Sequence, residues 1–119
     1  MQSVLDKTLQ LLEGRVVLVE GKRDQRALEE LGVDTWLFAP HGPPWRFVEK
    51  HATLCQAHGV VLLFDFDADG RRLTRQFTEF LLAFGVSPLS RVRNRFERVF
   101  GVRTVEDLPA RYDELLSKA

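Results

Sequence analysis

The chain has 119 residues, and its 17 basic and 17 acidic side chains leave a formal net charge of zero. A hydrophobic content of 45% and a charged content of 29% are ordinary for a soluble globular domain, and the length excludes a second core. No apolar run approaches the roughly 20 residues that span a bilayer. The N-terminal residues lack a basic region followed by an apolar block, so we expect no secretion signal. One cysteine, Cys55, excludes an internal disulfide and fits a reducing cytoplasm, so we expect a cytoplasmic protein without a membrane partner.

Helices and strands are predicted to alternate along the chain. Short apolar runs predict buried strands over residues 16–19, 36–39 and 60–64, and a weak edge strand over 86–89, where Pro88 is tolerated. The alternation predicts a three-layer α/β fold with a mostly parallel sheet of about four strands, in a single domain over residues 1–119. Apolar residues at helical spacing predict helices over 3–13, 22–31, 45–58, 71–84, 90–100 and 109–117.

Charge is distributed unevenly. Residues 1–70 carry a net charge of −4, residues 71–103 carry +6, and residues 104–119 carry −2. The basic block contains arginine and no lysine, and because arginine binds phosphate with a planar fork, the block predicts a polyanionic ligand; a solvated helix face is the alternative. The candidate nucleic-acid contacts are Lys22, Arg71, Arg72, Arg75, Arg91, Arg95 and Arg98.

Two acidic clusters stand directly after predicted buried strands. The first runs from Glu20 to Asp24 and the second from Asp65 to Gly70. Parallel sheets bind their ligands at the carboxyl ends of the strands, so we expect Glu20 to meet Asp65 and Asp67 at one edge. Converging carboxylates repel one another unless a cation lies between them, and a purely oxygen ligand set suits Mg²⁺. The sequence therefore predicts a magnesium site that handles phosphate.

Three other interpretations of the aspartates fit less well. A calcium loop needs glutamate at its twelfth position, where Gln76 stands, and a helix in place of the preceding strand. A phosphatase of the haloacid dehalogenase type needs more chain after Asp65, to supply a lysine and a later acidic pair. A response-regulator receiver domain needs adjacent acids after its first strand and a lysine after its last, and no lysine lies between Lys50 and Lys118.

The two clusters together resemble the signatures of the Toprim (topoisomerase–primase) domain. Glu20-Gly21-Lys22-Arg23-Asp24 has the E-G-x-x-D form, and Asp65-Phe66-Asp67-Ala68-Asp69-Gly70 has the D-x-D-x-x-G form, in the expected order and strand context. The resemblance covers about residues 15–90, with helix 3–13 before it and basic and terminal helices over 90–118 after it. The chain looks like the small stand-alone Toprim proteins, which are similar to the nuclease that matures 5S ribosomal RNA.

The resemblance implies a role for each acidic residue. Glu20 would move a proton to or from the attacking or leaving oxygen, and Asp65 and Asp67, with Glu20 beside them, would hold Mg²⁺, for which Mn²⁺ can substitute. A carboxylate close to two others should have a raised pKa, which suits acid–base work. Alternate positions of an extended segment point the same way, so the two aspartates can face one ion.

Four further residues lie beside these ligands in sequence. Gly21 would let the backbone approach the site, and Gly70 closes the second motif. Asp24 either assists through a metal-bound water or is a helix-start carboxylate, and Asp69 either caps the following helix or joins the metal shell. Outside the motifs, Trp45 either stacks on a base or packs against the protein.

These observations predict Mg²⁺-dependent phosphodiester chemistry on nucleic acid. RNA is favoured over DNA, and the most concrete form is an RNA nuclease of the 5S-maturation type. The alternative is a non-catalytic nucleic-acid-binding Toprim module that acts with a partner protein, since a chain of this size has little surface with which to grip a long substrate.

Overall fold

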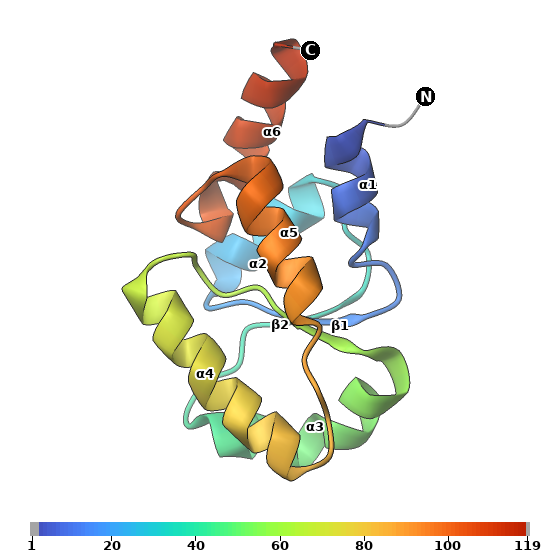
Figure 1. The fold of residues 1–119 in the computed structure, drawn as a ribbon, viewed down its shortest axis with the longest axis vertical. Coiled ribbons are helices and arrows are strands. Elements are labelled where there is room, and N and C mark those ends of the chain that lie inside the picture. The colour runs from blue at the N-terminus through green and yellow to red at the C-terminus, as the bar shows by residue number, and fades with distance from the viewer. Residues whose placement is uncertain (1–2, 119) are drawn as a thin grey trace.

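The computed structural model describes residues 3–118 and has a small parallel sheet between two layers of helices (Figure 1). The strands are β1 (Val16–Leu18), β2 (Trp36–Phe38) and β3 (Val60–Leu62), in the order β2-β1-β3. Both pairs are parallel, with Val17 opposite Leu37 on one side and Val61 on the other. The helices within residues 3–118 are α1 (Val4–Gln10), α2 (Lys22–Glu30), α3 (Pro44–His58), α4 (Ala68–Ala83), α5 (Ser90–Phe100) and α6 (Leu108–Ser117), with a 3₁₀ turn, η1 (Val105–Asp107).

Alternate residues of the strands divide the core into two halves. Val17 and Val61 belong to a cluster that also contains side chains of α1, α2, α5 and α6, whereas Val16 and Leu18 pack with α3 and α4. The strands are short runs of Val and Leu buried on both faces, as expected of a parallel sheet covered on both sides. Figure 1 shows α3 and α4 on one side of the sheet and the other helices opposite. The predicted α/β fold with a parallel sheet is confirmed.

The strand order decides where a ligand can bind. From β1 the chain passes through α2 to β2 on one side, and from β2 it passes through α3 across the sheet to β3 on the other side of β1. The order therefore reverses between β1 and β3, and their carboxyl ends form the crevice at which open α/β sheets bind ligands. Glu20 follows β1 and Asp65 follows β3, so the fold brings both acidic clusters to this point.

The prediction of about four strands was wrong, because residues 3–118 contain three. Residues 86–89 form no strand and make one hydrogen bond to the sheet, from the Leu89 N–H to the carbonyl of Val60 at 2.8 Å. Further along the same edge, the carbonyls of Leu62, at the end of β3, and of Phe64, just after it, accept hydrogen bonds from the side chain of Arg93. Since Pro88 has no N–H to donate, a helix with one long side chain covers this edge in place of a fourth strand.

Two helix boundaries also differ from the prediction. The first helix was expected over residues 3–13, but α1 ends at Gln10 and turns follow it up to Gly14. The helix expected after Gly70 begins earlier, at Ala68, because the Asp67 side chain accepts the Gly70 N–H and caps the first turn.

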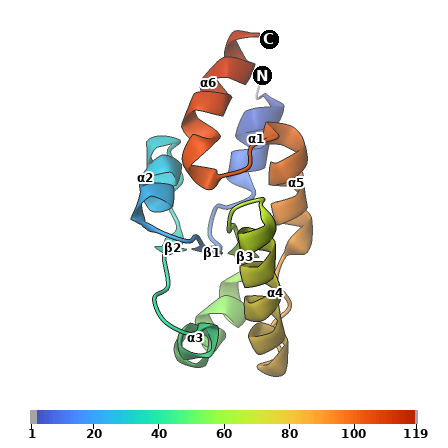
Figure 2. The same ribbon diagram turned by 90° about the vertical axis from the view of Figure 1, so that its left-hand side faces the viewer.

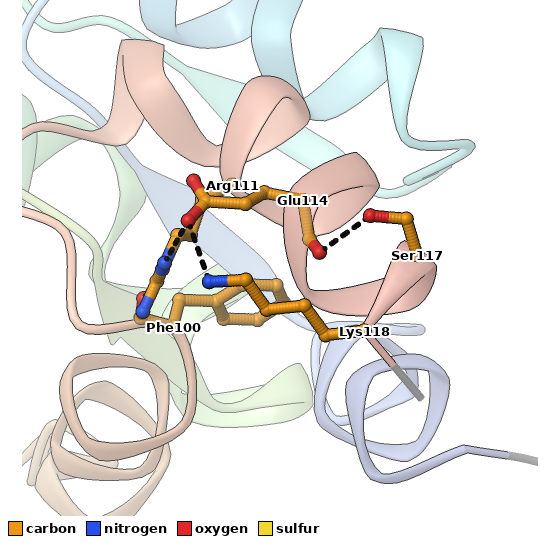
Figure 3. A network of polar contacts seen from close by, with 5 residues as sticks. All are labelled: Phe100, Arg111, Glu114, Ser117 and Lys118. Carbon is orange, nitrogen blue, oxygen red and sulfur yellow. Dashed lines mark hydrogen bonds and ion pairs between the residues drawn. The ribbon is translucent and has the colours of Figure 1, made fainter.

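The C-terminal helix α6 is tied to the end of α5 by Arg111. Its Nε donates to the carbonyl of Phe100 at 2.8 Å, and its guanidinium pairs with Glu114, as Figure 3 shows. Glu114 also pairs with Lys118, and its carbonyl accepts from the Ser117 hydroxyl. The segment between α5 and α6 is therefore held at both ends, which matters because this segment reaches the acidic clusters.

Candidate metal centre

Glu20 and Asp65 meet at the carboxyl edge of the sheet, although 45 residues separate them in the chain. Glu20 stands two residues after β1, and its Oε2 accepts the backbone N–H of Asp65 at 2.8 Å. Figure 2 looks onto this edge, where β1 and β3 lie side by side and the chain leaves each of them toward the viewer. The expected meeting of the first cluster with the second is therefore present in the structure.

The electrostatics of Glu20 reflect this meeting. The pKa of Glu20 is raised to about 7, chiefly by burial and to a smaller extent by the carboxylates of Asp65 and Asp67. The N–H of Asp65 donates to the charged form and offsets part of this effect. In the absence of a cation, Glu20 can therefore take up or release a proton near neutral pH.

Each of the three carboxylates is held through one oxygen. Glu20 binds the Asp65 N–H, Asp65 Oδ1 accepts the Val105 N–H at 2.9 Å, and Asp67 Oδ1 accepts the Gly70 N–H at 2.8 Å. Within residues 3–118, no protein N–H or O–H bonds to the second oxygen of any of the three. The backbone thus orients the carboxylates and leaves acceptor capacity for a ligand from outside.

This donor set fits a magnesium ion. Mg²⁺ is usually held in proteins by one or two carboxylates, with waters and substrate phosphates as its other ligands. In the described part of the chain, no group of three or more His, Cys, Asp or Glu side chains is placed to hold a metal ion by itself. An open site with oriented carboxylate oxygens is the arrangement that a water- and phosphate-ligated Mg²⁺ needs, and the absence of nitrogen and sulfur ligands disfavours zinc.

Gly70 is required by the packing of the second cluster. A Cβ atom at this position would lie 1.8 Å from the carbonyl oxygen of Asp65, which is backbone and cannot move aside. The glycine therefore lets α4 begin directly against Asp65. Gly21 is different, because a Cβ there would meet only Oδ2 of Asp24, at 4.0 Å. The protein itself does not need glycine at position 21.

Asp24 serves the start of α2. Its carboxylate accepts the Gly21 N–H at 3.0 Å, and the side chain is buried. Burial is the largest cause that raises the pKa of Asp24, followed by the carboxylate of Asp65. Of its two predicted roles, the helix-start carboxylate is present in the structure. Asp69 caps no helix: Asp67 does, while Asp69 is exposed and pairs with Arg72 at 3.2 Å.

Arg93 is a site residue that sequence reasoning missed. Its side chain is only 8% exposed, and besides Leu62 and Phe64 it binds the carbonyl of Asp65, at 2.9 Å. Its guanidinium carbon also lies 4.7 Å from the centre of the Phe66 ring. A buried cation thus holds the turn that carries the second cluster. In the sequence it is one arginine of a basic block, and only its position next to Val92, on the apolar side of the helix, distinguishes it.

The segment between α5 and α6 also completes the site, which the sequence did not predict. The Val105 N–H binds the Asp65 carboxylate, and the Phe66 N–H donates to the carbonyl of Arg103 at 2.7 Å. Residues 103–105 therefore lie across the second cluster and fix both the side chain of Asp65 and the backbone beside it. The expected Toprim-like core ended at about residue 90, before this segment.

The basic residues divide into two groups. Lys22 lies exposed at the first position of α2, and Arg71, Arg72 and Arg75 lie exposed along the first turns of α4, which begins at the acidic edge. Arg71 also pairs with Glu97 of α5 at 2.8 Å. The second group consists of Arg91, Arg95 and Arg98 of α5. These side chains line a hollow of about 440 Å³ together with Leu11, which places them beside α1.

The carboxylates lie on an open edge and line none of the hollows described here. One hollow, of about 820 Å³, lies between α2 and α6, and its lining includes Arg23 and Glu106 but none of Glu20, Asp65 and Asp67. An open edge suits the backbone of a macromolecule better than a small enclosed ligand.

The part of the chain that the structure describes has no helix long and apolar enough to cross a membrane. No protein-family model matches the sequence. A solved structure of a protein from Aquifex aeolicus is similar, with a TM-score of 0.68 and 25% identity over 87% of this chain and 94% of that one.

Two relatives carry the same family name. A UPF0292 protein of Methanosarcina barkeri is 32% identical over 100 residues, which cover 83% of this chain and 68% of the relative. One from Thermococcus sibiricus is 30% identical over 114 residues, which cover 94% of this chain and 87% of the relative. These names state no activity. On the strength of these alignments, the chain belongs to the UPF0292 family.

Proposed function

We propose that this protein has a Toprim-type site that carries out Mg²⁺-dependent phosphodiester chemistry on nucleic acid, and that it acts as an RNA nuclease. The proposal includes the finer description of the fold as a Toprim domain, and it takes its substrate class from the resemblance to the 5S-maturation nuclease. It draws on the two sequence motifs and on the way their residues are arranged.

The observation that carries the proposal is the contact between Glu20 and Asp65. These two side chains and that of Asp67 lie where the strand order reverses, between β1 and β3. Burial and repulsion from the aspartates raise the pKa of Glu20 to about 7. Such an arrangement costs folding free energy unless a cation or a proton relieves it. Carboxylates gathered at a ligand-binding edge therefore favour a functional role over a structural one.

Asp65, Asp67 and Glu20 would hold the ion. When bound, Mg²⁺ would neutralise phosphate charge and orient the phosphodiester for attack. The Val105 and Gly70 N–H groups keep the two aspartates in place, so little side-chain entropy remains to be lost on binding.

Glu20 would move the proton. A group with a pKa of about 7 can accept a proton from an attacking hydroxyl or water, or return one to the leaving oxygen, at neutral pH. A bound cation would lower this pKa, so Glu20 would then act as a base.

Exposed basic side chains next to the acidic edge would contact the nucleic-acid backbone. Lys22 and Arg72 stand at the first turns of α2 and α4, where their charges add to the positive ends of the helices. The other arginines of α4 extend this surface along the helix, while the group on α5 beside α1 would need a longer substrate to reach it.

The test is cleavage of a structured RNA by the purified protein. Asp67→Asn keeps a helix cap, because asparagine caps as well as aspartate does, but it removes the ligand charge. We expect the cleavage rate to fall by on the order of 100-fold or more. Asp69→Asn is the matched control: it lies two residues away and loses only an exposed ion pair, so its rate should stay near that of the wild type.

Glu20→Gln separates catalysis from binding alone. Under the proposal it abolishes turnover while RNA still binds. If the wild type binds RNA with a strong salt dependence but cleaves nothing with Mg²⁺ or Mn²⁺, the protein is the binding module that acts with a partner. Cleavage that survives unchanged in both the Glu20 and the Asp67 variants would reject the site.

A further inference from the structure

An exposed tryptophan lies at the start of α3. Trp45 is 45% exposed, and the guanidinium carbon of Arg46 lies 5.7 Å from the centre of its ring. The ring thus stays in contact with solvent beside a cation, although burying it would stabilise the fold. Neither the core clusters nor the acidic site accounts for Trp45.

The topology places Trp45 at the edge that carries the acidic clusters. It follows β2, which is parallel to β1 and directly beside it, so the loop after β2 emerges on the same side as Glu20. Figure 2 shows the first turns of α2, α3 and α4 all turned toward this edge. A polymer that crosses the carboxylates can therefore also pass the start of α3.

The charge around Trp45 suits an anion. Arg46 and Lys50 are exposed, and neither forms an ion pair within residues 3–118, although Glu49 lies between them in sequence. The first turn of α3 contains no acidic side chain and no side-chain cap, so the positive end of its helix dipole is not offset there. The starts of α2 and α4, by contrast, carry Asp24 and Asp69.

The loop that presents Trp45 is stiff. Pro43 caps α3 and Pro44 is its first residue, which restricts the backbone on the N-terminal side of the ring. Gly42 has a φ of +82°, and a Cβ there would lie 3.0 Å from Nη1 of Arg46, so the arginine lies against the loop. A ring and a cation held in place lose little conformational entropy when they bind a ligand.

We propose that Trp45 stacks on an unpaired base of a single-stranded nucleic-acid segment, with Arg46 binding the adjoining phosphate. An aromatic ring accepts a base that is free of its duplex neighbours, whereas paired bases are already stacked on one another. This inference rests on the proposed function and adds to it: the substrate has a single-stranded segment next to the phosphodiester that reacts.

The chain contains its own control. Its other tryptophan, Trp36, is 40% exposed, but it opens β2 at the opposite, amino edge of the sheet, and its ring lies 4.1 Å from that of His58. Trp36→Phe leaves Trp45 as the single fluorophore, and Trp45→Phe leaves Trp36. Each variant is titrated with a single-stranded oligouridylate, and with a duplex of equal length, in chelator so that no cleavage occurs.

We expect the single strand to quench the fluorescence of Trp45 and to leave that of Trp36 nearly unchanged. In a separate binding assay, Trp45→Ala should weaken single-strand affinity by about 5- to 150-fold, the range for removal of one base–aromatic stack, and leave duplex affinity unchanged. In cleavage of an RNA with a single-stranded flank, the same variant should raise KM and leave kcat close to that of the wild type. Circular dichroism checks that Trp45→Ala is folded.

The outcomes distinguish this inference from the function on which it rests. If the wild type binds and cleaves RNA but Trp45→Ala binds the single strand as well as the wild type does, the stacking role is wrong and the nuclease stands. Equal quenching of the two tryptophans, or an equal loss of duplex affinity, also overturns the stacking role. If the wild type binds neither single strand nor duplex, both proposals fail.

Discussion

The two edges of the parallel sheet carry different polar chemistry. At the amino edge, polar side chains bond to nearby backbone: Arg15 Nε donates to the carbonyl of Leu11 at 2.8 Å, and the Thr35 hydroxyl donates to the carbonyl of Arg15. At the carboxyl edge, Glu20 and Asp65 approach each other with Asp67 nearby, and the pKa of Glu20 rises to about 7. The amino edge satisfies its polar groups within the protein, whereas the carboxyl edge gathers like charges whose repulsion a proton or a cation can relieve.

The largest expected effect compares a glycine from each edge. Gly70→Ala puts a Cβ 1.8 Å from the Asp65 carbonyl oxygen and should lower the free energy of unfolding by on the order of 3 kcal/mol or more. Gly14→Ala, in the loop before β1, has no atom within 4 Å of the new Cβ and should cost about 1–2 kcal/mol through its positive φ alone. Urea unfolding measures both, and equal losses would contradict the close approach at Gly70.

The second comparison uses one arginine from each edge. Arg93→Met leaves three carbonyls, two of them in buried hydrogen bonds, without their donor and should lower the free energy of unfolding by about 2–4 kcal/mol. It should also weaken Mn²⁺ binding, because the turn at Asp65 is no longer held. Arg15→Met loses the hydrogen bond to the Leu11 carbonyl and should cost about 0.5–1.5 kcal/mol without an effect on Mn²⁺ binding.

Arg93→Lys refines this test, because lysine keeps the charge but loses the fork. A fall in stability without any change in Mn²⁺ affinity, measured by electron paramagnetic resonance on folded protein, would make Arg93 purely structural.

The third prediction separates stability from metal binding at Val105. Val105→Pro removes the N–H that binds Asp65, at the first position of a 3₁₀ turn that follows an extended residue, where proline is tolerated. It should weaken Mn²⁺ binding and lower the free energy of unfolding by only about 1 kcal/mol. Val105→Ala keeps the N–H but leaves a cavity in the core, so it should cost about 1–3 kcal/mol and bind Mn²⁺ as the wild type does. If the same variant lost more than the other both in stability and in Mn²⁺ binding, this account would be contradicted.

The smallest effect is a pH dependence at the carboxyl edge. The pKa of Glu20 in the folded protein is about 7, above its ordinary value of 4.5, so between these values the folded state holds more protons than the unfolded state. The stability of the metal-free protein should therefore carry a contribution that falls as pH rises from about 4.5 to about 7. Urea midpoints measured in chelator should show this slope, and Glu20→Gln should reduce it. A slope that is identical in wild type and variant would mean that Glu20 does not titrate in this range.

The sequence predicted the parts of the site that depend on local pattern. Short runs of Val and Leu marked β1 and β3, and the acids directly after them had to emerge at one edge once the sheet was parallel. The prediction failed where similar sequence patterns adopt different local structures. The run that includes Val86 and Leu89 has the composition of a strand, but only one of its N–H groups reaches β3. Asp69 was the expected cap of the helix after Gly70 and Asp67 was expected only as a metal ligand, but backbone geometry makes Asp67 the cap.

The amino-acid order alone thus determined an α/β chain with Glu20, Asp65 and Asp67 at a common edge, because periodicity and strand direction are local properties. Only the tertiary structure decided how those carboxylates are held. Arg93 and the Val105 N–H bind groups 28 and 40 residues away in the chain, and such pairs follow from the packing of α5 and of the segment after it. A hydrogen bond between distant residues leaves no periodic trace in the sequence, so an arginine that holds the site looks the same there as one that faces solvent.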